Sequence, residues 1–341
     1  MYISWKDRVV FNKVFIIAEA GSNHNGNLDT AIEIVHRAGE SGVDAVKFQD
    51  FTLLSLFSPK DYEQTLGLED RSWRRSVELL SVKPEWHGPL AEAAHEAGIH
   101  YFSTPFSPEA ADSLDGFVPF YKIASGDITY VSLLERVASK GKGVFLSTGA
   151  SRMDEIERAV GILNKHDPPF VCVMHCIMLY PPPDETLHLN FIDTLKKRFN
   201  QPIGFSDHSL DTEAALIAVA KGACAIEKHF TLDRTQKGAD HKNSLDPEGF
   251  RGFTQRIRRC ERMLDDLNRP IGEREGRERV YARRGIYAGE DLKKGEKLTP
   301  EKVRFLRPKL GTGAEDFGSL KNRRLDTDVT KGTSLDQSMF M

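Results

Sequence analysis

Short apolar runs alternate with longer amphipathic segments through most of the chain. Eight runs have the length and apolar character of buried parallel strands, over residues 14–19, 45–49, 100–104, 120–125, 144–148, 170–176, 203–208 and 223–229. Between them, apolar residues three and four apart predict helices over residues 29–41, 85–97, 131–140, 153–164, 189–199 and 212–221. Eight strand–helix units predict an α/β protein with a TIM (β/α)8 barrel.

An open doubly wound sheet is the alternative architecture. It usually carries a G-x-G-x-x-G turn after its first strand, whereas residues 21–26 here read GSNHNG. We therefore favour the barrel.

The pattern changes near the C-terminus. A helix predicted over residues 247–267 ends the barrel domain, residues 1–267. Residues 268–283 read as a linker, because charged residues, glycine and proline interrupt any apolar period. Short alternating segments with turn sequences such as AGED (288–291) and KKGE (293–296) then predict a small β-rich domain over residues 284–341.

Composition narrows the class of protein. The 341 residues are 28% charged and 40% hydrophobic with a formal net charge of -3, so a nucleic-acid partner is not expected. The N-terminus contains Lys6, Asp7 and Arg8 instead of an apolar leader, and no run approaches the roughly 20 apolar residues of a membrane helix. We expect a cytoplasmic protein with small-molecule substrates and no membrane partner. Its four cysteines lack zinc-type spacing and are expected to be reduced.

Two tetrads, SDHS (206–209) and EKHF (227–230), each close a predicted strand. Residues two apart in a strand share a face, so Ser206 points with His208 and Glu227 with His229. A single strand histidine is usually structural, but two at equivalent strand ends favour metal ligands. The same alternation turns Lys228 away from the barrel interior.

Three residues are left out of the predicted metal site. Lys228 is excluded by its direction, and His175 and His241 are interpreted as hydrogen-bonding supports. Other predicted strand ends carry ammonium groups and hydroxyls, which together suit a phosphorylated carboxylate such as phosphoenolpyruvate.

Several motifs occur in order and cover nearly the whole chain. They are IAEAGSNHNG (17–26), KFQ (47–49), STPF (103–106), YKIASG (121–126), LSTG (146–149), the two tetrads and GADH (238–241). The chain resembles the sialic acid synthase family. That family joins phosphoenolpyruvate to an N-acetylmannosamine-type sugar, giving a nine-carbon 2-keto acid and phosphate, and its members carry a C-terminal antifreeze-like (SAF) domain.

The resemblance implies a role for each matching residue. Glu19 corresponds to the general base. The residues that would grip phosphoenolpyruvate are Lys47, Thr104, Lys122, Ser125, Ser147 and Ser206. Those around the sugar would be Gln49, Phe106, Tyr180, Asp240 and Arg307. His208 and His229 would hold a divalent metal, usually Mn²⁺ with Mg²⁺ or Co²⁺ as alternatives, which polarises the sugar aldehyde.

The resemblance also implies an assembly. Arg307 matches an arginine that reaches from the antifreeze-like domain of one subunit into the barrel of its partner. A domain-exchanged homodimer is therefore expected.

One segment departs from the family pattern. After Cys176 the family commonly has threonine and a second polar residue, whereas this chain has Ile177 and Met178. A polar contact to phosphoenolpyruvate is expected to be lost. Three hypotheses remain: an N-acetylneuraminate synthase, a legionaminic or pseudaminic acid synthase acting on a 2,4-diacetamido-trideoxyhexose, and a non-catalytic sugar-binding protein. A 6-phosphorylated acceptor is a further alternative.

Overall fold

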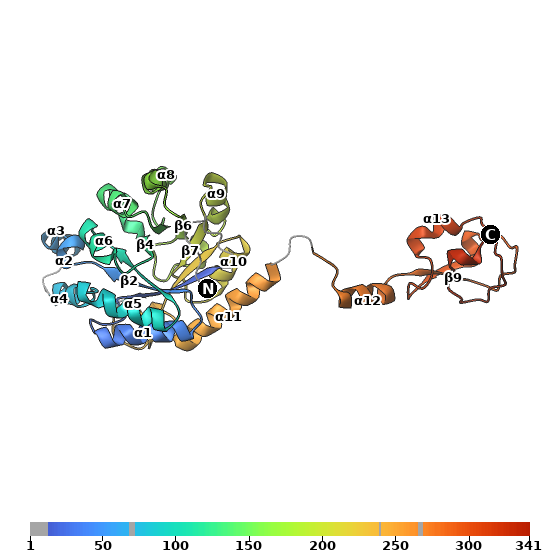
Figure 1. Cartoon of the computed structure of the whole chain (residues 1–341), viewed down its shortest axis with the longest axis horizontal. Coiled ribbons are helices and arrows are strands. Elements are labelled where there is room, and N and C mark those ends of the chain that lie inside the picture. Colours follow the sequence, from blue (N-terminus) through green and yellow to red (C-terminus); the bar gives the residue numbers. More distant parts are fainter. Residues whose placement is uncertain (1–12, 68–71, 239, 265–268) are drawn as a thin grey trace. The chain divides into compact units, whose positions relative to one another are not determined.

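The computed structural model describes residues 13–67, 72–238, 240–264 and 269–341. The chain divides into two compact units, Met1–Asp265 and Asp266–Met341, which Figure 1 colours from blue to orange and from orange to red. The predicted boundary at residues 267 and 268 lies outside the described residues, as does the N-terminal segment with Lys6, Asp7 and Arg8. Within the described part of the chain, no helix is both long and apolar enough to span a membrane.

The first unit is built on eight parallel strands in the order β3-β2-β1-β8-β7-β6-β5-β4. The strands are β1 Phe15–Gly21, β2 Ala45–Asp50, β3 His100–Pro105, β4 Phe120–Ile123, β5 Gly143–Ser147, β6 Val171–Cys176, β7 Ile203–Asp207 and β8 Ala225–His229. The outermost strands of this order, β3 and β4, lie in contact, so the sheet curls into a nearly closed barrel. The predicted TIM-type fold is confirmed.

Helices surround this barrel (Figure 1). Those that follow the strands are α1 Leu28–Glu40, α5 His87–Glu96, α6 Pro108–Leu114, α7 Val131–Ala138, α8 Met153–Leu163, α9 Phe191–Arg198, α10 Glu213–Ala220 and α11 Pro247–Leu264. Three further short helices lie between β2 and α5, namely α2 Leu53–Leu56, α3 Pro59–Leu66 and α4 Ser72–Leu79. These three were not predicted.

The sequence at the start of helix α1 explains where this helix begins. Asn27 adopts an extended backbone and its side chain accepts a hydrogen bond from Thr30 N at 2.9 Å, which caps the helix. Along the helix, Ala31, Ile34, Val35 and Ala38 are buried at spacings of three and four. This stripe packs the helix against the barrel wall.

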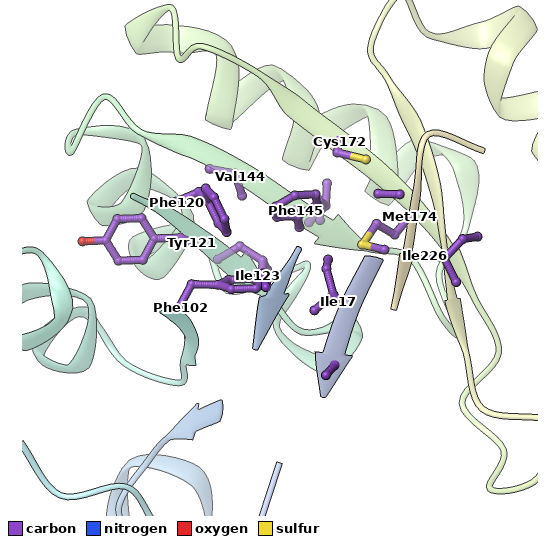
Figure 2. Close-up of a cluster of buried hydrophobic side chains, with 14 of the residues drawn as sticks. Ile17, Phe102, Phe120, Tyr121, Ile123, Val144, Phe145, Cys172, Met174 and Ile226 are labelled. Atoms are coloured by element: carbon purple, nitrogen blue, oxygen red, sulfur yellow. The ribbon is translucent and has the colours of Figure 1, made fainter. Parts of the chain in front are cut away.

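Aromatic side chains fill the barrel near the N-terminal ends of its strands. Ring centroids lie 4.7 Å apart for Phe102 and Phe120, 5.3 Å for Phe120 and Phe145, and 5.1 Å for Phe145 and Phe170. Figure 2 shows Phe102, Phe120 and Phe145 in the core with Ile17 and Met174. This phenylalanine layer forms an apolar floor, and the polar side chains lie toward the other end of the strands.

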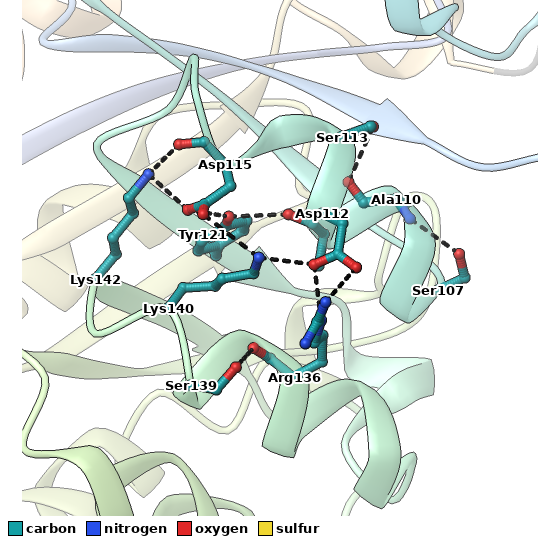
Figure 3. A network of polar contacts seen from close by, with 11 residues as sticks. Ser107, Ala110, Asp112, Ser113, Asp115, Tyr121, Arg136, Ser139, Lys140 and Lys142 are labelled. Atoms are coloured by element: carbon teal, nitrogen blue, oxygen red, sulfur yellow. Dashed lines mark hydrogen bonds and ion pairs between the residues drawn. The ribbon is translucent and has the colours of Figure 1, made fainter.

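Polar contacts tie β4 to the helices outside it (Figure 3). The Tyr121 hydroxyl donates to the Ala111 carbonyl at 3.0 Å and to Asp115 at 3.1 Å. Arg136 on α7 donates from Nε to Asp112 on α6 at 2.7 Å. The last pair is nearly half exposed, so solvent screens it and its contribution to stability is small.

The second unit has its own core. Helix α12 (Glu273–Ala282) precedes strand β9 (Gly285–Ala288), which pairs antiparallel with β10 (Val303–Leu306), and a short helix α13 (Phe317–Leu320) follows. The buried residues of this core include Ile286, Leu292, Leu298, Leu320, Leu325 and Leu335. The segment expected to be a linker thus contains α12, in which no residue is buried.

Candidate active site

A cavity of about 540 Å³ lies at the C-terminal ends of the barrel strands. Its lining includes these residues singled out from the sequence: Glu19, Lys47, Gln49, Thr104, Phe106, Lys122, Ser125, Ser147, Tyr180, Ser206, His208, His229 and Asp240. Arg307 belongs to the second unit, where its side chain is exposed. The first unit therefore gathers every predicted site residue except Arg307.

Two lysines and two glutamates form a buried cluster in this cavity. Lys47 Nζ lies 2.5 Å from Glu19 Oε2 and 3.8 Å from Glu227 Oε1. Lys122 Nζ lies 2.6 Å from Glu227 Oε2. Ser206 Oγ donates to the other oxygen of Glu227 at 3.0 Å. The cluster comes from four strands, β1, β2, β4 and β8, whose ends converge.

Mutual pairing keeps this cluster charged. Burial opposes ionisation of Glu227, but the ammonium groups of Lys122 and Lys47 outweigh burial and lower its pKa to about 2. Burial likewise opposes the charge on Lys47, but Glu19 and Glu227 raise its pKa above the ordinary value. The cavity thus presents two ammonium groups of which each is already balanced by a carboxylate.

The hydroxyls around the cluster differ in their availability. Thr104 Oγ1 accepts from Lys47 at 3.1 Å, and Ser125 Oγ accepts from the Gly149 N–H at 2.9 Å. Ser147 Oγ is buried and has no hydrogen-bond partner among the described residues. A buried hydroxyl without a partner is costly, so Ser147 is the hydroxyl best placed to bond a ligand.

The two histidines adjoin this cluster. His208 donates from Nδ1 to the Ile177 carbonyl at 2.7 Å, which leaves Nε2 as the acceptor of the neutral ring. Its ring stacks on Tyr180 at 4.0 Å and lies 5.4 Å from that of His229, centroid to centroid. Burial, followed by the neighbouring His229, lowers the pKa of His208 to about 3, so the imidazole stays neutral.

The chemistry of the two histidines suits a divalent metal. Neutral imidazoles are common metal ligands, and His229 Nδ1 is buried with no hydrogen-bond partner in the described residues. No group of three or more His, Cys, Asp or Glu within the described ranges could hold a metal. The two adjacent imidazoles, with ring centroids 5.4 Å apart, suit an open site, in which water and substrate would complete the coordination.

Glycine at position 21 permits the close packing beside Glu19. Gly21 has a φ of 51°, and the strand register shifts between Glu19 and Gly21. A methyl group at this position would lie 3.1 Å from Asp240 Oδ2 and 3.4 Å from Glu19 Oε1. Gln49 donates to the same oxygen of Glu19 at 2.7 Å, and Lys47 lies beside the other oxygen. Glu19 is thus held between a lysine and an amide.

The residues left out of the metal site lie elsewhere. Lys228 lies on the outer face of β8, with its ammonium 5.8 Å from the Phe253 ring of α11, which confirms its predicted direction. His175 Nε2 bonds the Leu187 carbonyl at 2.7 Å. His241 bonds Thr231 Oγ1 at 2.7 Å. Both histidines are hydrogen-bonded supports outside the cavity lining.

Comparison with known proteins decides the family. A model of the NeuB family matches residues 34–269, and a model of the SAF domain matches residues 283–341. The chain belongs to the NeuB family. NeuB-family synthases condense phosphoenolpyruvate with a sugar, so this chain is an enzyme that forms a carbon–carbon bond with phosphoenolpyruvate as donor.

Relatives within the NeuB family share most of their length with this chain. The N,N'-diacetyllegionaminic acid synthase of Legionella pneumophila is 36% identical over 330 residues, covering 94% of this chain and 93% of that protein. The pseudaminic acid synthase of Campylobacter jejuni is 36% identical over 335 residues, covering 96% and 97%. A crystal structure of N-acetylneuraminic acid synthetase from Leptospira borgpetersenii, in complex with citrate, matches with a TM-score of 0.70 and 35% identity, covering 79% of this chain and 90% of that one.

Sequence reasoning missed part of the cavity lining of this NeuB-family enzyme. Asp127 lines it from a 3-10 turn that includes Ser125, whereas Ser125 was expected to end a strand. Burial raises the pKa of Asp127 to about 6, and its Oδ2 has no hydrogen-bond partner in the described chain. Leu56 and Met178 also line the cavity. The only signal for Asp127 was its place two residues beyond Ser125.

Proposed function

We propose that this NeuB-family enzyme joins phosphoenolpyruvate to an N-acetylmannosamine-type sugar, giving N-acetylneuraminate and phosphate. The observation that carries the proposal is the buried pair of ammonium groups beside the Ser147 hydroxyl, which has no hydrogen-bond partner among the described residues, next to the two imidazoles in one cavity. An anion and a carbonyl compound could thus be held side by side.

The donor would bind at the lysine end of the cavity. Lys47 and Lys122 would neutralise its phosphate and carboxylate, and the hydroxyls would donate oriented hydrogen bonds. Those hydroxyls belong to Thr104, Ser125, Ser147 and Ser206. Because both ammonium groups are already paired with glutamates, binding the donor must redistribute these pairs.

His208 and His229 would hold a divalent metal, with Mn²⁺ the expected ion and Mg²⁺ or Co²⁺ as alternatives. When bound, the metal supplies a Lewis acid that polarises the aldehyde of the open-chain sugar. The hydrogen bond from His208 to Ile177 and the stacking of Tyr180 on His208 orient that imidazole.

Glu19 would act as the base. Its carboxylate, held by Lys47 and Gln49, would accept a proton from the water that adds to C2 of the donor. Gln49, Phe106, Tyr180 and Asp240 would surround the sugar. Tyr180 is 48% exposed, so this end of the cavity reaches solvent.

A diacetamido sugar is the second candidate acceptor. The relatives from Legionella and Campylobacter are named for legionaminic and pseudaminic acid. Leu56, Phe106 and Met178 give the cavity apolar lining that suits extra methyl groups. Among the described residues of the lining, Lys47 and Lys122 are the only Lys or Arg side chains, which disfavours a phosphorylated acceptor.

The test is phosphate release from phosphoenolpyruvate with Mn²⁺. N-acetylmannosamine, its 6-phosphate and 2,4-diacetamido-trideoxyhexoses are supplied separately, with His208→Ala as the control. Release with N-acetylmannosamine alone supports the proposal. Release only with a diacetamido sugar replaces it with the second candidate, and absence of release with every acceptor contradicts both.

We further propose that Arg307 completes the site of a partner subunit in a domain-exchanged homodimer. The test mixes Glu19→Gln chains with Arg307→Ala chains and isolates the hybrid dimers. If the domains exchange, one site in each hybrid combines an intact barrel with an intact arginine and activity returns. If Arg307 serves its own chain, every site carries one defect and the hybrids stay inactive.

A further inference from the structure

A buried ion pair lies on the outer face of β7 and β8, behind the cavity. Lys228 Nζ lies 2.7 Å from Asp207 Oδ2, and both side chains are at most 1% exposed. Lys228 also donates to the Ser209 carbonyl at 2.6 Å and lies 3.3 Å from Ser209 Oγ. The Ser209 N–H donates to the second oxygen of Asp207 at 2.9 Å. We call these three residues the outer clamp.

The outer clamp is built around the two histidines. Asp207 and Lys228 are direct partners in the register of β7 and β8, and each immediately precedes a histidine. Lys228 therefore bonds the residues on both sides of His208, while its own backbone leads into His229. Because neighbouring strand residues point to opposite faces, the clamp restrains the imidazoles without entering the cavity.

We infer that Asp207 and Lys228 are positioning residues that set the separation of the His208 and His229 imidazoles and so the affinity for the metal. The inference rests on the metal site proposed above. With only two imidazoles as protein ligands, affinity depends strongly on how well their separation is fixed before the metal binds. The backbone on both sides of His208 is held by one ammonium group, which supplies this restraint.

A purely structural ion pair is the competing explanation, and two variants separate the roles. Lys228→Met alone leaves the buried Asp207 carboxylate without a counter-ion, so this variant is expected to destabilise the barrel. The double variant, Asp207→Asn with Lys228→Met, leaves no buried charge without a counter-ion, and the asparagine oxygen can still accept from the Ser209 N–H. Replacing a buried pair with uncharged residues often restores stability. The bonds that tie residue 228 to residues 207 and 209 remain absent.

The experiment measures Mn²⁺ binding to the full-length protein from the electron paramagnetic resonance signal of free Mn²⁺, together with the melting temperature. The double variant is expected to melt near the wild type yet bind Mn²⁺ about tenfold more weakly, a loss typical of residues that orient metal ligands. Arg258→Met is the control, because its pair with Asp44, at 2.6 Å, lies at the opposite end of the strands. That variant should have a lower melting temperature than the wild type and an unchanged Mn²⁺ affinity.

Each contrary outcome has a distinct meaning. Wild-type Mn²⁺ affinity in the double variant, or an equal loss in Arg258→Met, overturns the positioning role and leaves the metal site intact. If the wild type and His208→Ala bind Mn²⁺ equally, the proposed metal site is wrong and the inference falls with it.

Discussion

Replacing Glu227 with glutamine removes one carboxylate from the buried cluster and keeps the shape of the side chain. Glu227 lies 2.6 Å from Lys122 and 3.8 Å from Lys47. Lys47 retains Glu19 in this variant, but Lys122 loses its carboxylate and keeps as partners only the neutral glutamine amide and Met174 Sδ, at 3.7 Å, among the polar contacts described. An ammonium group is then buried without a counter-ion, so we expect the barrel to lose stability.

The size of the loss follows from the pKa of Glu227. That pKa falls from the ordinary 4.5 to about 2 on folding. One pKa unit corresponds to about 1.4 kcal/mol, so the carboxylate contributes about 3 kcal/mol at neutral pH. Because the folded pKa is the lower one, this stability is present above pH 4.5 and is lost as the pH falls toward 2. The wild type and Glu227→Gln should therefore differ by about 3 kcal/mol at pH 7, and by roughly 1 kcal/mol less at pH 4.

Urea unfolding followed by tryptophan fluorescence measures this difference in the stability of the first structural unit, the barrel. Trp73 and Trp86 lie in the first unit, and residues 266–341 contain no tryptophan, so the signal does not come from the second unit. Glu157→Gln is the matched control. Its partner Arg198 is 57% exposed, so solvent screens that pair and the variant should lose much less stability than Glu227→Gln.

Two results would refute the reasoning. A loss below about 1 kcal/mol in Glu227→Gln at pH 7 would mean that the two ammonium groups do not depend on this carboxylate. A difference that grows between pH 7 and pH 4 would have the wrong sign for a lowered pKa.

Three further predictions concern the cavity. Gly21→Ala forces an alanine into a positive φ beside Asp240, so we expect about 1 kcal/mol or more of destabilisation and a raised sugar KM, measured by unfolding and steady-state kinetics. Removing metal with EDTA should abolish phosphate release, and Mn²⁺ should restore it in the wild type but not in His208→Gln. Met178→Thr adds a hydroxyl near Ser125, so the KM for phosphoenolpyruvate should fall, and an unchanged KM would contradict a missing polar contact at this position.

The barrel was predictable because strands that are buried on both faces have continuous apolar sequences. The limits of the strands were less predictable. Strand β4 ends at Ile123, and Ser125 lies in a 3-10 turn, because the chain bends directly after the apolar run. Helix α12 was not predicted because it has no apolar stripe, and all its side chains lie in or near solvent.

The contents of the cavity were predictable because parallel strands end at one face, where side chains distant in sequence meet. The pairing within it was not. Which lysine meets which glutamate depends on the register between strands, which the sequence does not state. The outer clamp shows the same limit, since Lys228 was read only as pointing away and its bond to Asp207 comes from the register of β7 with β8. The roles assigned to the site residues remain predictions.

The phenylalanine layer has a consequence for the order of events during turnover. It closes the barrel at one end, so both substrates, water and both products must use the mouth near Tyr180. Lys47 and Lys122 are buried in the cavity, at 3% and 2% exposure, whereas Tyr180 at the mouth is 48% exposed, so an acceptor already in place would block the donor. We therefore expect the donor to enter first. An unreactive sugar analogue should then inhibit uncompetitively against phosphoenolpyruvate, and noncompetitive inhibition would show that the donor can still enter when the sugar site is occupied.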